Sequence, residues 1–206
     1  MGKIRLLFLL LLPLTVFAQE YNRTDDKGRR QGPWVDFHAN GQKRYEGQFK
    51  NDRCVGEFKY YDEQGRLQAT NQFDKSGTRA LNKQYASNGT LIATGTYVNQ
   101  KKEGEWRYFS KDNGRLILVE ENRGGQVHGA SKVYYDTGVL MTECHYENGL
   151  REGEAKTYYP SGALKEKGLF LHGEKTGIWT TYNEDGDVIS TENYTVPTGM
   201  EPLRPQ

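Results

Sequence analysis

The stretch "GEWRYFSKDNGRLILVEENRGGQVHG", from Gly104 to Gly129, contains one copy of a motif that recurs along the chain. Units begin at Gly32, Gly56, Ala80, Gly104, Gly129, Gly153 and Gly177. Successive starts are 24 residues apart, except for one 25-residue step after Gly104. Self-similarity at a fixed period is the signature of a repeat architecture. Seven units therefore account for residues 32–194.

Each unit has the pattern of a β-hairpin. A short aromatic-rich run leads to a glycine, and a second run and a polar connector follow it. The glycines are Gly41, Gly65, Gly89, Gly114, Gly138, Gly162 and Gly186. Glycine tolerates the positive φ that tight hairpin turns require. The fourth unit has one additional residue before its glycine, which predicts a longer turn or a bulge.

Aromatic and aliphatic residues recur at fixed positions around this turn. Five residues after each unit start stand Phe37, Tyr61, Tyr85, Phe109, Tyr134, Tyr158 and Tyr182. Across the turn stand Leu67, Leu91, Leu116, Leu140, Leu164 and Val188, with Lys43 in the first unit. A second aromatic row, two residues after the start, includes Trp34, Phe58, Trp106 and Trp179. The two aromatic rows differ in strand parity, so they should lie on opposite faces of a sheet. The sequence does not decide which face is buried.

These features predict an all-β fold. A single hairpin is only marginally stable in water, so the hairpins must stack on one another. We expect a solenoid of stacked antiparallel β-hairpins that forms one elongated twisted sheet of about fourteen strands. The third unit should be irregular, because Ala80 replaces the first glycine and Asn82 replaces the aromatic residue.

The two ends of the chain differ from the repeats. Residues 1–18 combine Lys3 and Arg5 with a 12-residue apolar run, Leu6 to Phe17, and end in Ala18. This pattern predicts a secretory signal peptide, because the run is too short to span a bilayer. Residues 19–31 are interpreted as a leader and N-terminal cap. Residues 195–206 contain three prolines and are predicted to form a disordered tail.

Charge and the reactive residue types exclude several classes of function. The 28 basic and 27 acidic residues become 26 and 27 once Lys3 and Arg5 are removed, so no nucleic-acid binding is expected. Cys54 and Cys144 lie more than three units apart and should remain separate thiols. The four histidines fall at different unit positions, so neither a metal site nor a cofactor is predicted.

Segments such as "GEWRYFSKDNG", "GEAKTYYPSG" and "GIWTTYNEDG", each followed by a second run, resemble MORN repeats. The similarity is greatest to their bacterial variant, and it covers residues 32–194. It departs at Ala80 and at the missing aromatic residues Asn82, Ser131 and Ala155. The resemblance implies a β-hairpin solenoid used for interaction or scaffolding, including contact with membranes or partner proteins. Some bacterial members are described as antitoxins, a role that an export signal does not favour; an immunity-like exported protein remains an alternative.

Two rows of residues are candidate binding surfaces. A basic row three residues after the unit start comprises Lys59, Lys83, Arg107, Lys132 and Lys156. It would suit anionic lipid headgroups, although a solvated face with ion pairs to Glu57, Glu105 and Glu154 is favoured. Trp34, Trp106 and Trp179 form the second row, for which core packing is favoured over a ligand platform.

No catalytic constellation is visible, so the sequence does not predict an enzyme. We expect an exported, monomeric interaction or scaffold protein of a bacterial cell envelope, located in the periplasm, at the outer membrane or outside the cell. The expected partner is an unidentified protein. The alternatives are peripheral binding to an anionic membrane and an antitoxin-like or immunity-like role.

Overall fold

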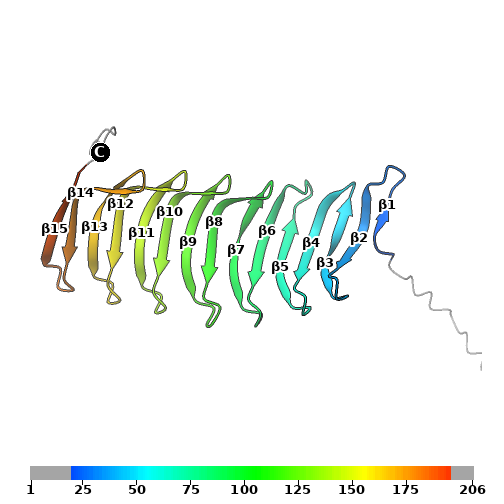
Figure 1. Cartoon of the computed structure of the whole chain (residues 1–206), viewed down its shortest axis with the longest axis horizontal. Coiled ribbons are helices and arrows are strands. Elements are labelled where there is room, and N and C mark those ends of the chain that lie inside the picture. Colours follow the sequence, from blue (N-terminus) through cyan, green and yellow to red (C-terminus); the bar gives the residue numbers. More distant parts are fainter. Residues whose placement is uncertain (1–19, 196–206) are drawn as a thin grey trace, which may run out of the picture.

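The computed structural model describes residues 20–195, which form fifteen β-strands in one antiparallel sheet, with the strands in chain order (Figure 1). The strands are β1 Arg23–Thr24, β2 Arg30–Phe37, β3 Lys43–Lys50, β4 Arg53–Tyr61, β5 Leu67–Phe73, β6 Arg79–Tyr85, β7 Leu91–Val98, β8 Lys101–Phe109, β9 Leu116–Arg123, β10 Gln126–Tyr134, β11 Leu140–Glu147, β12 Leu150–Tyr158, β13 Leu164–Leu171, β14 Glu174–Tyr182 and β15 Val188–Tyr194. The predicted all-β hairpin solenoid is confirmed. The predicted signal peptide and residues 196–206 of the predicted tail lie outside the described residues.

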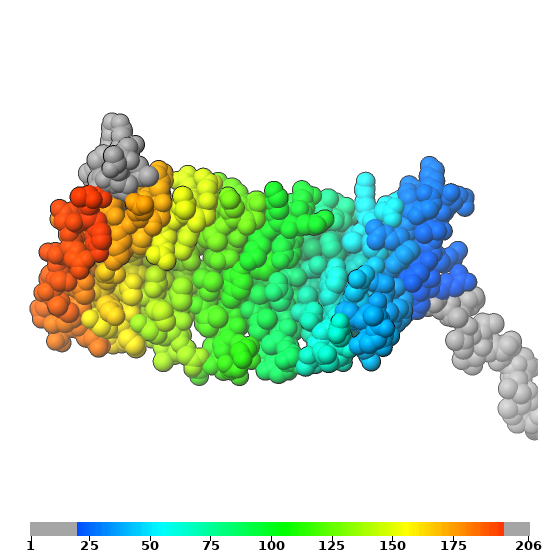
Figure 2. Space-filling view, viewed as in Figure 1, coloured from blue at the N-terminus to red at the C-terminus, as the bar shows by residue number. Residues whose placement is uncertain are grey.

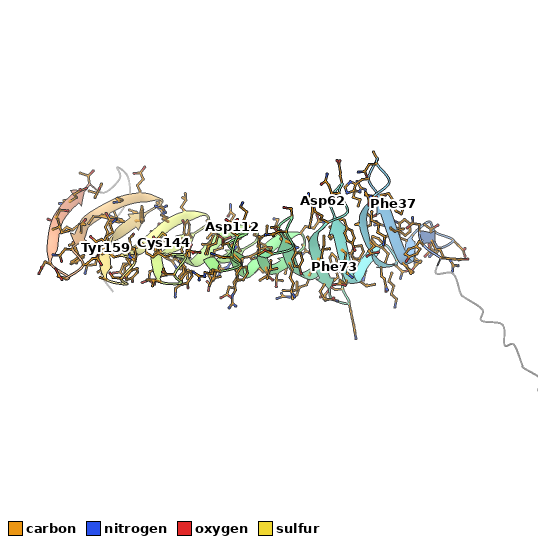
Figure 3. All side chains as sticks on the ribbon, turned by 90° about the horizontal axis from the view of Figure 1, so that it is seen from below. Phe37, Asp62, Phe73, Asp112, Cys144 and Tyr159 are labelled. Atoms are coloured by element: carbon orange, nitrogen blue, oxygen red, sulfur yellow. The ribbon has the colours of Figure 1, made fainter. Side chains whose placement is uncertain are left out.

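The sheet is a single layer, with side chains projecting from both of its sides (Figure 3). Successive units follow one another along the long axis of the body, and β1 and β15 lie at its two ends (Figures 1 and 2). The strand additional to the fourteen expected is β1, which comes from the leader and pairs with the start of β2. Asn22 continues this pairing, because its backbone N–H donates to Pro33 O and its side-chain oxygen accepts from Val35 N.

The turn within each unit is built as the glycine pattern predicts. In the first unit the N–H of Gly41, with φ of 83°, donates to the carbonyl of His38, and His38 N donates to Gln42 O. In the fourth unit the corresponding closing bond runs from Ser110 N to Arg115 O, so that turn is one residue longer. Tyr61 then pairs directly with Leu67 across the second turn, and the register skips one residue beside this pair.

The segments between units, expected to be polar connectors, are tight turns as well. Between β3 and β4 the chain reverses through Asn51 and Asp52, both with positive φ, as two-residue hairpin turns require. The unit-start glycine Gly56 then lies inside β4 with φ of 69°, where the register shifts between Gln48 and Glu46 of β3. The unit-start glycines therefore mark bulges within strands rather than strand ends.

The third unit is irregular in the way that Ala80 predicts. β5 and β6 pair without a register shift, so no bulge forms at Ala80. The connection is instead longer, because β5 ends at Phe73 and β6 begins at Arg79. Asp74 Oδ1 organises this loop by accepting hydrogen bonds from the N–H groups of Ser76 and Gly77. The residues that form a bulge in other units lengthen the loop here.

The core lies on one face, which we call the tryptophan face because Trp34, Trp106 and Trp179 lie on it. The opposite face, which carries the basic row, is called the lysine face. Phe58, Trp106 and Trp179 are almost fully buried, whereas Phe37 at the start of the other aromatic row is 51% exposed. The row two residues after the unit start is therefore the buried one.

Within this row, a glycine on the preceding strand makes room for each of the three buried rings. A Cβ on Gly47 would lie 2.4 Å from the ring of Phe58, and one on Gly95 would lie 2.2 Å from the ring of Trp106. Gly168 has the same relation to Trp179, at 2.2 Å. Units that lack the ring also lack this glycine: the register pairs Asn82 with Asn71, Ser131 with Glu120, and Ala155 with Cys144.

Candidate functional site

The tryptophan rings are packing elements of the sheet. Trp106 is 0% exposed; its indole N–H donates to Thr96 O at 3.1 Å, and Lys102 Nζ lies 4.8 Å from its ring centroid. Trp179 has an equivalent bond to Leu169 O and is covered by Lys175, whose Nζ lies 3.8 Å from the ring centroid. Trp34 is half-buried against Phe49. The rings of Trp106 and Trp179 are thus largely buried within the sheet and do not form the exposed platform that a stacking ligand would need.

The basic row divides into paired and unpaired members. Three of its members form ion pairs with the glutamate two residues earlier on the same strand: Lys59 with Glu57, Arg107 with Glu105 and Lys156 with Glu154, at 3.4, 2.7 and 2.7 Å. Lys83 and Lys132 are exposed and form no ion pair with any residue in the range 20–195. The residues two positions before them are Leu81 and Ala130, where the paired members have glutamates. The row therefore alternates between neutralised and free charges from unit to unit.

Tyrosines on the lysine face are bonded to glutamates of the adjacent strand. The hydroxyl of Tyr61 donates to Glu46, and that of Tyr158 donates to Glu143, both at 2.6 Å. Burial, together with the neighbouring carboxylate, raises the pKa of Tyr61 and that of Tyr158 to about 12. These groups stay protonated at neutral pH, so they strengthen the sheet and do not act as bases.

The tryptophan face has a hollow of about 360 Å³ in the fifth to seventh units. Its lining residues are Ser131, Val133, Met141, Thr142, Cys144, Tyr146, Arg151, Ala155, Thr157, Glu166, Phe170, Lys175 and Trp179. We call this feature the small-residue hollow, because it lies where Ser131 and Ala155 stand in place of aromatic residues. The sequence shows that two units lack the aromatic residue, but it does not predict the space that results.

The small-residue hollow combines aromatic walls with polar groups. Arg151 lies over the ring of Phe170, at 5.0 Å, and its Nε donates to the hydroxyl of Tyr146 at 3.4 Å. Lys175 is paired with Glu166 at 3.0 Å. Arg151 forms no ion pair with any residue that the structure describes. The hollow therefore carries one cation that no carboxylate of residues 20–195 neutralises.

The two cysteines lie in different parts of the sheet, and both are partly buried. Cys54 and Cys144 are free thiols, as predicted, and burial raises the pKa of both. A neutral thiol is a poor nucleophile. Within residues 20–195 no three His, Cys, Asp or Glu side chains gather into a metal-binding group, and no helix is long and apolar enough to cross a bilayer. His38 serves the fold, because its Nε2 bonds the carbonyl of Tyr61 in the next unit.

Comparison with known families assigns the repeats. The family described as "MORN repeat variant" matches residues 30–51, 127–148, 151–172 and 175–195. The chain is a MORN-repeat protein. The matched segments include the first unit and the last three, and the shared register of the sheet extends the same architecture through the units between them.

Comparison with individual proteins adds no assignment. No curated protein matches the chain significantly. Two structures of TarM, one of them an S. aureus point mutant in complex with fondaparinux, alpha-GlcNAc-glycerol and UDP, are 10% and 12% identical to it. They cover 59% and 58% of this chain with a TM-score of 0.25, and the chain spans only 19% of their length. A likeness this distant carries no argument about function.

Proposed function

We propose that this MORN-repeat protein is exported and non-enzymatic, and that it binds a protein partner in a bacterial cell envelope. The observation that carries the proposal is the single-layer sheet, whose two broad faces are uncovered by any other described element over all seven units. Elongated repeat sheets of this kind offer extended surfaces that suit macromolecular partners better than enclosed small substrates. The signal-like residues 1–18 support export.

The absence of an activated group supports a binding role over catalysis. Among the described residues the two thiols are held neutral, the paired tyrosines are held protonated, and the basic residues closest to glutamates are ion-paired. An enzyme needs groups poised to exchange protons or attack a substrate. We therefore assign the repeats a scaffolding or interaction role.

Binding to an anionic membrane through the basic row is the weaker candidate. Three of its five cations face glutamates within ion-pair distance, which cancels most of the field that would attract lipid headgroups. Flotation with phosphatidylglycerol vesicles at low and high salt tests it. Association at low salt that is lost in the Lys83→Gln/Lys132→Gln variant would favour the membrane over a protein partner.

The main test uses residues 19–206 as bait in a solubilised envelope fraction of the native host, with chemical crosslinking. Two variants separate the faces: Lys83→Glu/Lys132→Glu changes the lysine face, and Ala155→Trp changes the tryptophan face. We expect one defined protein to be captured by the unmodified chain and lost from one variant only. Capture of no specific protein would count against the interaction role. Cell fractionation with and without residues 1–18 tests export separately.

A further inference from the structure

The small-residue hollow lies where two units of the buried aromatic row lack their rings. Where a unit carries Phe58, Trp106 or Trp179, the ring lies over the glycine of the preceding strand. In β10 and β12 the ring positions hold Ser131 and Ala155, and Cys144 of β11 lies between them in the register, at the position of the glycine. Three adjacent strands therefore present small side chains, and two of these stand where a ring would otherwise lie.

The walls of the small-residue hollow suit an aromatic group from outside. Phe170 and Trp179 border it on one side, and Val133 and Met141 border it on the other. Its volume of about 360 Å³ is near the lower end of the range of roughly 300–1,000 Å³ that is usual for ligand pockets. A single flat ring is therefore better matched to it than a large ligand. Edge-to-face packing, as between Phe170 and Trp179 at 5.1 Å, is already used beside it.

Two polar groups in the small-residue hollow are available to bond a partner. Ser131 is only 7% exposed, yet its hydroxyl makes none of the hydrogen bonds formed among residues 20–195. Asp36 Oδ2 is the only fully buried side-chain polar atom without a hydrogen-bond partner among residues 20–195, so the hydroxyl of Ser131 stays accessible and can bond a group that enters the hollow. Arg151 provides a guanidinium that is held in place by Phe170 and Tyr146 but is not neutralised. A guanidinium in this state favours a carboxylate.

We propose that the small-residue hollow is the anchor site for one aromatic side chain of the protein partner, in a segment with an acidic residue beside it. The inference rests on the proposed interaction role and specifies its site. The partner's ring takes the position that Trp106 and Trp179 occupy in their own units. Its hydrogen-bonding group meets Ser131, and the adjacent carboxylate meets Arg151. No covalent step is involved.

The location of binding is tested with capped peptides and the thiol of Cys144, which lines the hollow. In a Cys54→Ser background, Cys144 is the only thiol, and its rate of alkylation reports occupancy. The probes are acetyl-Thr-Glu-Trp-Glu-Thr-amide, the same peptide with Gln in place of Glu, and the same peptide with Ala in place of Trp. We expect the first to slow alkylation most, the second less and the third not at all.

Variants then test each contact by fluorescence anisotropy of the labelled peptides. Ala155→Trp fills the hollow and should abolish binding, whereas Arg151→Gln should erase a preference of about tenfold for the Glu peptide over the Gln peptide. Ser131→Ala should weaken binding several-fold without changing that preference. Lys132→Gln, next to Ser131 but on the lysine face, is the matched control and should bind normally. Thermal unfolding checks that each variant is folded.

Three results would overturn the proposal. The first is equal protection of Cys144 by the Trp and Ala peptides. The second is unchanged peptide binding by a folded Ala155→Trp variant. The third is protection by free N-acetyltryptophan but by none of the peptides, which would assign the hollow to a small aromatic acid. Because these assays do not use the native partner, their failure leaves the pull-down result intact and is distinguishable from failure of the interaction role.

Discussion

The two boundaries of the third unit solve the same packing problem in different ways. Toward the fourth unit, β7 and β8 meet through the buried ring of Trp106 over Gly95, with a bulge at Gly104 and a two-residue turn. Toward the second unit, β5 and β6 meet through paired asparagines, with no bulge and a longer loop. Asn82 Nδ2 donates to Asn71 Oδ1 at 2.7 Å. A buried ring therefore occurs together with a glycine on the preceding strand, and a bulge occurs together with a two-residue turn.

The largest expected effect is the loss of the ring at the aromatic boundary. Trp106→Ala removes a fully buried side chain, and truncations of this kind cost about 3–5 kcal/mol. Asn82→Ala, its counterpart at the polar boundary, should cost only about 1–2 kcal/mol through the hydrogen bond lost to Asn71. Denaturant unfolding measures both, and hydrogen exchange should show the loss of protection in β7 and β8. Equal costs at the two boundaries would contradict the comparison.

The second prediction concerns the glycine beneath the ring. Gly95→Ala places a methyl group 2.2 Å from Trp106, so the ring must move, at a cost of about 1–3 kcal/mol. The double variant with Trp106→Ala should be less unstable than the sum of the two single changes, because the clash disappears with the ring. Asn71→Ala is the control at the polar boundary. An additive double-mutant cycle would show that the glycine does not serve the ring.

The third prediction concerns the first residues of the third and fourth units, where alanine and glycine are exchanged. Gly104→Ala has open space for its Cβ but must keep a φ of 69°, which costs about 1–2 kcal/mol for a residue with a side chain. Ala80→Gly changes a position in regular register and should cost about 0.5–1 kcal/mol by added backbone freedom. Melting temperatures of both variants test this. Stabilisation by Ala80→Gly would mean that the straight boundary is strained.

The smallest expected effect is on the dependence of stability on pH. Tyr108, beside Trp106, is half-buried and its hydroxyl donates to Glu120, and both features raise its pKa above the usual 10. Its contribution to the free energy of unfolding is complete below pH 10 and falls as the pH rises toward the folded-state pKa. Tyr108→Phe should therefore flatten the decline in melting temperature between about pH 9 and about pH 11.5. Asn82→Ala is expected to lower stability without changing that slope.

Much of the fold follows from local sequence patterns. The turn glycines fix the hairpins, because the positive φ at Gly41 and its equivalents excludes most other residues. The additional residue before Gly114 correctly predicted the longer turn, and strand parity correctly separated the two aromatic rows. The turns between units were not predicted as hairpin turns, although Asn148-Gly149 and Gly124-Gly125 are typical hairpin dipeptides. Of the candidate site, the positions of the basic row and of the missing aromatic residues were predictable, since both recur with the period.

The sequence by itself determined the repeat, the hairpin and the existence of an open sheet, because these depend on spacing of about 24 residues and on residues with restricted backbone preferences. Only the tertiary structure decided which aromatic row is buried. It also decided which cations are neutralised, and that Ser131, Cys144 and Ala155 join into one hollow. These properties depend on the register between strands of different units, which brings together side chains that are distant in the sequence.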